Sequence, residues 1–202
     1  MTAGNFIDLV NRGFYNDMKI QRADGFVVQT GDPAQEGRGK DVGFVPPGSD
    51  KVRNPNPILS PTQPNPNPNP NPNPNPNPDP NPTQVRTVPL EVFVKNDKGP
   101  IYGTTFDDDS RGGYAATLPF NAYGALGMAR GEYDTDSGSS QFFWLLFDSD
   151  LTPAGKNLLD GRYSCFGYTT EGARFLSDLK EGDIIQSAKV IQGLDNLKQP
   201  KE

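Results

Sequence analysis

The stretch FVVQTGD at residues 26–32 decides how this chain folds. Its first five residues favour a strand, and the Gly-Asp-Pro of residues 31–33 ends that strand. A second strand-like run precedes it at residues 18–22. Two later stretches, GSSQFFW at residues 138–144 and LLDGRY at residues 158–163, add further polar and apolar side chains. We expect these stretches to place one arginine, two glutamines and several aromatic and aliphatic side chains in one cleft.

Short strand-like runs recur along the rest of the chain, and two helical segments accompany them. Helices are predicted at residues 2–12 and 171–180. Strands are predicted at residues 18–22, 25–30, 88–94, 123–130, 141–147, 163–168 and 183–192. This order predicts a mostly β fold, an antiparallel β-barrel that is closed or nearly closed, with two flanking helices.

The two predicted helices carry end signals and apolar faces. Thr2 can cap the first helix and Gly13 can end it, while Phe6, Leu9 and Val10 share one face. In the second helix the residues expected to point inward are Ala173, Phe175, Leu176 and Leu179.

A low-complexity segment interrupts the folded part of the chain. Residues 64–82 alternate proline with asparagine, broken only by Asp79. Each proline fixes its own φ and pushes the preceding residue toward extended conformations, so this repeat predicts a semi-rigid, solvated spacer. We therefore divide the chain into one folded domain, residues 1–44 and 85–202, and an insertion at residues 45–84.

The composition excludes several classes of function. The net charge is −6 with no basic run, which argues against nucleic-acid binding. No apolar stretch of about 18 residues occurs, so no membrane span is predicted. The chain has no histidine, which excludes Ser-His-Asp catalysis and His-ligated metal sites. The lone Cys165 is expected in the core. We predict neither a metal site nor a cofactor.

Three of these motifs, in this order, resemble the cyclophilin family of peptidyl-prolyl cis-trans isomerases. They are FxxQxGD at residues 26–32, GSSQFF at residues 138–143 and LDGRYxxFG at residues 159–167. TAGNF at residues 2–6 is similar to the start of that family's first helix. Further stretches resemble its thylakoid-lumen, multidomain branch, in which a helical segment precedes the cyclophilin domain; they lie at residues 86–91, 119–122, 128–130 and 141–146.

The resemblance implies a folding helper that acts on proline-containing peptides or unfolded proteins in a thylakoid lumen or periplasm. Cyclophilin barrels begin with two strands before the first helix, whereas this chain begins at the helix. The first two strands are therefore expected to be missing, so that the chain is a fragment or its barrel is open along one edge. No export signal is visible in this sequence.

Isomerisation of an X–Pro bond needs neither a nucleophile nor a metal. The bond rotates over a barrier of about 18–20 kcal/mol, because resonance stiffens the C–N bond. As the bond twists, the prolyl nitrogen regains a lone pair, to which a guanidinium can donate a hydrogen bond at any physiological pH. Lowering the barrier by about 7 kcal/mol gives an acceleration of roughly 10⁵-fold.

The resemblance assigns roles to residues that match the family's motifs. Arg22 would be the catalytic donor, and Gln29 would orient Arg22 or the substrate. Gln141 and the backbone around Arg130 would bind the substrate main chain. The slot for the proline ring and its wall would be formed by Phe26, Val27, Phe143, Leu159 and Tyr163.

Several positions depart from the usual pattern. Tyr163 stands where many members have histidine, Val27 where methionine is usual, and Leu158 where drug-sensitive members have tryptophan, which predicts weak cyclosporin binding. The spacing from Arg22 to Gln29 is also one residue shorter than usual.

Two alternatives to an active isomerase stay open. The domain could be a proline-peptide binding or assembly-chaperone module with little or no turnover, or an incomplete barrel without activity. The Asn-Pro repeat is inserted shortly after residue 32, near the expected cleft. It could therefore occupy the slot as an internal competitor.

Overall fold

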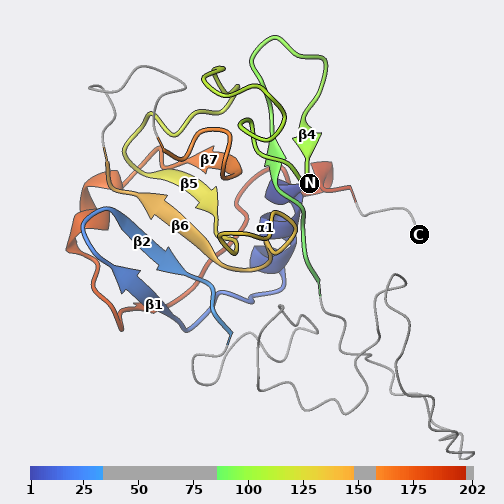
Figure 1. Ribbon diagram of the computed structural model, residues 1–202. Coiled ribbons are helices and arrows are strands. Elements are labelled where there is room, and N and C mark those ends of the chain that lie inside the picture. The colour runs from blue at the N-terminus through green and yellow to red at the C-terminus, as the bar shows by residue number, and fades with distance from the viewer. Residues whose placement is uncertain (34–85, 148–157, 199–202) are drawn as a thin grey trace, which may run out of the picture.

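The computed structural model describes residues 1–33, 86–147 and 158–198 (Figure 1). The predicted insertion at residues 45–84 lies outside the described residues, as do residues 34–44 and 85 of the predicted domain. The domain boundaries and the proposed contact of the repeat with the slot therefore stay predictions. Among the helices in the described ranges, none is both long enough and apolar enough to cross a membrane.

Eight strands, one α-helix and two 3₁₀ helices are defined within the described residues. The helical elements are α1 (Thr2–Asn11), η3 (Ala173–Asp178) and η4 (Leu194–Asn196). The strands are β1 (Met18–Ala23), β2 (Val27–Thr30), β3 (Glu91–Val92), β4 (Ile101–Tyr102), β5 (Ala125–Met128), β6 (Phe142–Leu145), β7 (Cys165–Tyr168) and β8 (Ile184–Ile185). The mostly β prediction is therefore confirmed.

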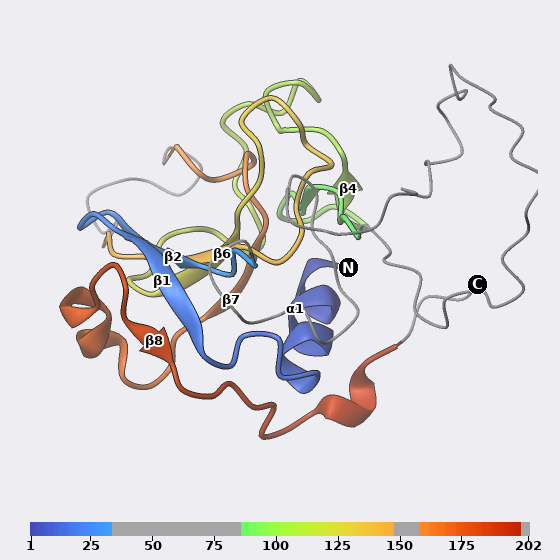
Figure 2. The same cartoon turned by 90° about the horizontal axis from the view of Figure 1, so that it is seen from below.

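Six strands form one antiparallel sheet in the order β7-β5-β6-β2-β1-β8, and β3 pairs with β4 beside it. Figure 2 shows β8 next to β1 at the far end of this sheet. The end strands β7 and β8 are not neighbours in the sheet formed by the described residues. The prediction was a closed or nearly closed barrel that lacks its first two strands, and a sheet with two separate end strands agrees with its nearly closed, open-edged form.

The alternation of side chains along β6 places two core layers on opposite faces of the sheet, and a third cluster of Leu90, Val92, Val94 and Phe106 lies around β3. Phe142 packs with the residues around α1, and its neighbour Phe143 packs on the opposite face of the sheet. Figure 2 shows α1 on one side of the strands and the loops in green on the other. The first layer consists of Leu9, Val10, Phe14, Tyr15, Met18 and Phe142. The second consists of Val27, Phe120, Ala125, Phe143 and Leu145.

The ends of α1 confirm one prediction and correct another. Gly13 has a φ of 71°. Its N–H donates to the Val10 carbonyl at 3.0 Å, and the Phe14 N–H donates to the Leu9 carbonyl at 3.0 Å, which is a Schellman ending. Thr2 is not the cap, because it is the first helical residue and is buried. Its N–H donates instead to the Glu91 carboxylate at 2.7 Å, an acceptor that lies 89 residues away in the sequence.

The C-terminal elements are shorter than predicted. The expected helix at residues 171–180 is the 3₁₀ helix η3, in which Leu176 is buried but Phe175 is 56% exposed. A 3₁₀ helix has three residues per turn, so positions spaced for an α-helix no longer share one face. The predicted strand at residues 183–192 is ordered as a strand only at β8. Beyond β8 the Ala188 N–H donates a hydrogen bond to Asn16 Oδ1 at 2.9 Å. This N–H is therefore bound to a side chain and not to a neighbouring strand.

One buried hydrogen bond ties the first core layer to the segment that leads into β6. The Tyr15 hydroxyl donates to the Ser140 carbonyl at 2.8 Å, and Tyr15 is 1% exposed. Burial raises the pKa of Tyr15 far above its ordinary value, so the hydroxyl remains a donor at all physiological pH values.

We expect Tyr15→Phe to lower the free energy of unfolding by about 1–2 kcal/mol, because the Ser140 carbonyl loses its buried donor. Urea unfolding monitored by circular dichroism measures this change. Tyr133→Phe is the matched control, since Tyr133 is 94% exposed and should leave the midpoint unchanged. Equal midpoints for both variants would show that the Tyr15 hydroxyl adds nothing.

Candidate active site

A β-bulge in β1 determines which side chains reach the site. Ile20 pairs with Thr30, and the next paired residue, Arg22, is opposite Gln29, so Gln21 is the extra residue. Such a bulge re-aims the side chains around it. Arg22 and Gln29 are therefore direct neighbours across the two strands. They are so although the spacing between them in the sequence is one residue shorter than the usual pattern.

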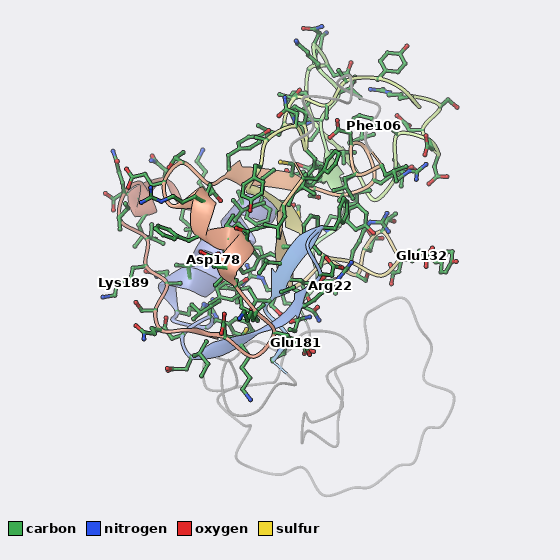
Figure 3. The ribbon with its side chains drawn as sticks, turned by 90° about the vertical axis from the view of Figure 1, so that its left-hand side faces the viewer. Arg22, Phe106, Glu132, Asp178, Glu181 and Lys189 are labelled. Atoms are coloured by element: carbon green, nitrogen blue, oxygen red, sulfur yellow. The ribbon has the colours of Figure 1, made fainter. Side chains whose placement is uncertain are left out.

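The predicted residues surround one cavity of about 220 Å³. All of them except Gln141 line it, together with Ala129. Strands β1 and β2 and the turn between them contribute Arg22, Phe26, Val27 and Gln29; the other lining residues are Arg130, Phe143, Leu159 and Tyr163. Figure 3 shows Arg22 beside the β1–β2 pair. The residues selected from the sequence thus share one cavity, apart from Gln141.

Aromatic contacts fix the Phe143 ring at the base of the cavity. Phe143 is 5% exposed, stacks on Phe120 at 5.8 Å between ring centroids and meets Tyr163 edge-on at 5.9 Å. The ring also covers Gly127, its partner on β5. A Cβ at Gly127 would lie 2.7 Å from Phe143 Cε2 and 2.8 Å from Phe120 Cε1, so only glycine leaves room for the ring in this position.

Gln141 lies next to the cavity in a network of amide side chains. Its Oε1 accepts a hydrogen bond from Gln29 Nε2 at 2.9 Å and another from Gln21 Nε2 at 2.6 Å. Gln21 Oε1 in turn accepts the Asp32 backbone N–H at 3.0 Å. Because both bonds go to the oxygen of Gln141, its NH₂ group is left as a donor. The sequence analysis did not select Gln21, since an alternating strand would turn it away from its neighbour Arg22.

Arg130 and Tyr163 together form one part of the cavity wall. The Arg130 guanidinium lies 4.9 Å from the centroid of the Tyr163 ring. It also donates to the backbone carbonyls of Arg162 at 2.8 Å, Gly131 at 2.7 Å and Glu132 at 3.1 Å. These bonds hold the aromatic wall in place, so the Arg130 side chain supports the cavity as well as lining it.

A second cavity of about 470 Å³ shares part of this wall. Phe26, Arg130, Leu159 and Tyr163 line both cavities, and the larger one adds Leu158, which is 75% exposed. A peptide bound in the small cavity could therefore extend into a wider, partly apolar cavity.

The described part of the chain holds no cluster of His, Cys, Asp or Glu residues that could bind a metal ion. Cys165 was expected in the core. It is partly buried and packs against the second core layer. Burial raises the pKa of the Cys165 thiol to about 11, so it stays protonated and is a poor nucleophile at neutral pH.

Known proteins resemble this chain over nearly its whole length. The family of cyclophilin type peptidyl-prolyl cis-trans isomerases matches residues 1–198. The chain is 45% identical over 200 residues to the chloroplastic peptidyl-prolyl cis-trans isomerase CYP38 of Arabidopsis thaliana, which covers 99% of this chain and 37% of that protein. It is 43% identical over 198 residues to a putative thylakoid lumen peptidyl-prolyl cis-trans isomerase of Synechocystis, which covers 98% of this chain and 42% of that protein.

A cyclophilin type isomerase of Cryptosporidium parvum, crystallised in the presence of the dipeptide Ala-Pro, covers 94% of this chain and 84% of its own, with a TM-score of 0.49 and 16% identity. The chain thus spans well under half the length of the two curated relatives. The family match nevertheless includes every described element of the fold and every residue of the cavity. This chain belongs to the cyclophilin family of peptidyl-prolyl cis-trans isomerases.

Proposed function

We propose that this chain catalyses cis–trans isomerisation of X–Pro bonds in proline-containing peptides or unfolded proteins. The observation that carries the proposal is the shared cavity, in which an arginine stands beside a slot of aromatic and aliphatic side chains. A proline ring is small and apolar, and the walls Val27 and Phe143 are 4% and 5% exposed. Burying the ring against them supplies hydrophobic binding energy without fixing the isomer.

Arg22 is the proposed catalytic residue. When the X–Pro bond twists, its resonance is lost and the prolyl nitrogen becomes a hydrogen-bond acceptor. A guanidinium N–H of Arg22 would donate to that nitrogen, an interaction that exists only in the twisted state and therefore lowers the barrier. Gln29, paired with Arg22 across the hairpin, would keep the substrate in register with it.

The substrate main chain is proposed to bind along the amide network. Because Gln141 Oε1 is already occupied by two donors, its NH₂ group is suited to a backbone carbonyl of the substrate. The peptide would then enter along Gln141, place its proline on Phe143 and leave past Arg130. The names of the relatives favour a thylakoid lumen or a similar exported compartment as the place of action.

The first test is Arg22→Ala in an exchange assay with a short X–Pro peptide. We expect kcat/KM to fall about 100-fold, the usual effect of removing one electrostatic donor to a transition state. Arg174→Ala is the control, since Arg174 lies over Phe175 on η3, away from the cavity. Equal rates for Arg22→Ala and the wild type would reject the mechanism, and peptide binding without faster exchange would favour the binding-module alternative.

The second test is Gly127→Ala, because the added Cβ would collide with the ring of Phe143, a residue that lines the cavity, and with that of Phe120. We expect the Kd for a proline peptide to rise about tenfold, because a displaced Phe143 ring loses contact with the proline, and about 1.4 kcal/mol of lost binding energy is a tenfold change. Titration calorimetry measures the change. Gly167→Ala on β7 is the matched control, because its added Cβ would meet only Leu126 Cδ1 at an ordinary 3.8 Å. Unaltered affinity in Gly127→Ala would place the proline elsewhere.

A further inference from the structure

Asp24 lies in the turn between β1 and β2, outside the residues that line the cavity. Its Oδ2 accepts a hydrogen bond from Arg22 Nε at 2.7 Å and lies 2.5 Å from Arg22 Nη2 in the same ion pair. Its Oδ1 accepts the backbone N–H groups of Phe26 at 3.0 Å and Val27 at 2.9 Å. One carboxylate therefore joins the guanidinium to the two residues that begin the wall of the slot.

Hydrogen bonds with the backbone of its own turn hold Asp24 in place, so that its carboxylate can fix the position of the Arg22 guanidinium. Asp24 Oδ1 is fixed by two N–H groups of its own turn, and the Asp24 N–H donates to the Val27 carbonyl at 3.3 Å. With this carboxylate immobilised, the guanidinium that binds Oδ2 is restricted to few rotamers. Arg22 lines the cavity while it makes this ion pair, so the restricted conformation is the one that faces the slot.

We propose that Asp24 is a positioning residue that holds the Arg22 guanidinium at the proline slot. The inference rests on the proposed function, in which Arg22 is the catalytic donor. The pair engages the Nε–H and the Nη2 side of the guanidinium, so a substrate would meet the remaining N–H groups. Asp24 itself touches no substrate in this arrangement and acts through Arg22.

The size of the Arg22–Asp24 interaction energy favours a role in positioning Arg22 over a role in stabilising the fold. The side chains of Arg22 and Asp24 are 52% and 39% exposed, and exposed ion pairs typically add no more than about 1 kcal/mol to stability. The same exposure limits how far the carboxylate neutralises the guanidinium, since charges 4 Å apart in bulk water attract by only about 1 kcal/mol. A restraint of similar size on the catalytic donor changes a rate about fivefold.

The protonation state of Asp24 agrees with this role. The backbone hydrogen bond from Val27 is the largest cause that lowers the pKa of Asp24, and the Arg22 guanidinium and the Phe26 N–H lower it further. The carboxylate is therefore charged throughout the neutral and mildly acidic range.

The test is Asp24→Asn. Asparagine keeps an oxygen for the Phe26 and Val27 N–H groups, but an NH₂ donor replaces the charged oxygen that Arg22 binds, so the ion pair is lost. We expect kcat to fall about fivefold with KM and the melting temperature unchanged. Asp97→Asn is the matched control: Asp97 pairs with Arg111, its side chain is 38% exposed, and neither residue lines the cavity. An unchanged or faster kcat in Asp24→Asn would overturn the inference.

A double-mutant cycle separates this inference from the proposed function. In an Arg22→Ala background, Asp24→Asn should have no further effect on kcat, because Asp24 acts through Arg22. An equal loss in both backgrounds overturns the inference and leaves the role of Arg22 intact. If Arg22→Ala alone has no effect, the proposed function fails.

A measurement without turnover tests the ion pair directly. The Nε–H signal of Arg22 in ¹H–¹⁵N spectra should exchange slowly with water in the wild type and rapidly in Asp24→Asn, while the signal of Arg174 stays the same. Slow exchange in both proteins would overturn the inference even if the isomerase rate is low.

Discussion

Adjacent side chains of β6 must point to opposite faces of the sheet, and the rest of this structure depends on that constraint. Phe142 closes the core layer beneath α1, and Phe143 forms the base of the proposed slot. A single strand therefore carries both the stability of the fold and the apolar surface of the site. Any shift of register by one residue would exchange the two rings, so the pairing of β6 with β2 and β5 fixes the site as firmly as it fixes the core.

The proposed mechanism uses no nucleophile and no metal. It depends on the position of a hydrogen-bond donor. The proposed mechanism requires Arg22 to be held in place, and three features of the hairpin surround this side chain: the bulge at Gln21, the cross-strand partner Gln29 and the Asp24 carboxylate in the turn. Arg22 is half exposed, so its electrostatic effect is weaker than that of a buried charge. Preorganisation must then supply much of the effect, which is why small restraints on this side chain matter.

The substituted positions of the cavity are packed into its wall. Tyr163, expected from the resemblance at a position where many members have histidine, meets Phe143 edge-on and lies beneath the Arg130 guanidinium. Val27 is almost fully buried in the second core layer, so its shorter side chain is part of a packed surface. These contacts give the cavity packed, largely apolar walls.

The sequence by itself determined the elements that depend on neighbours in the chain. Period-two runs predicted the strands that form the sheet, Gly13 predicted the end of α1, and the ordered motifs predicted nearly all the residues of the cavity. Only the tertiary structure decided features that depend on distant partners. Glu91 replaced Thr2 as the acceptor at the start of α1, and β8 stopped after two residues. The bulge at Gln21 likewise became visible only once β2 fixed the register of β1. Local patterns record backbone preferences, whereas hydrogen bonds between segments far apart in the chain are set by the packed fold.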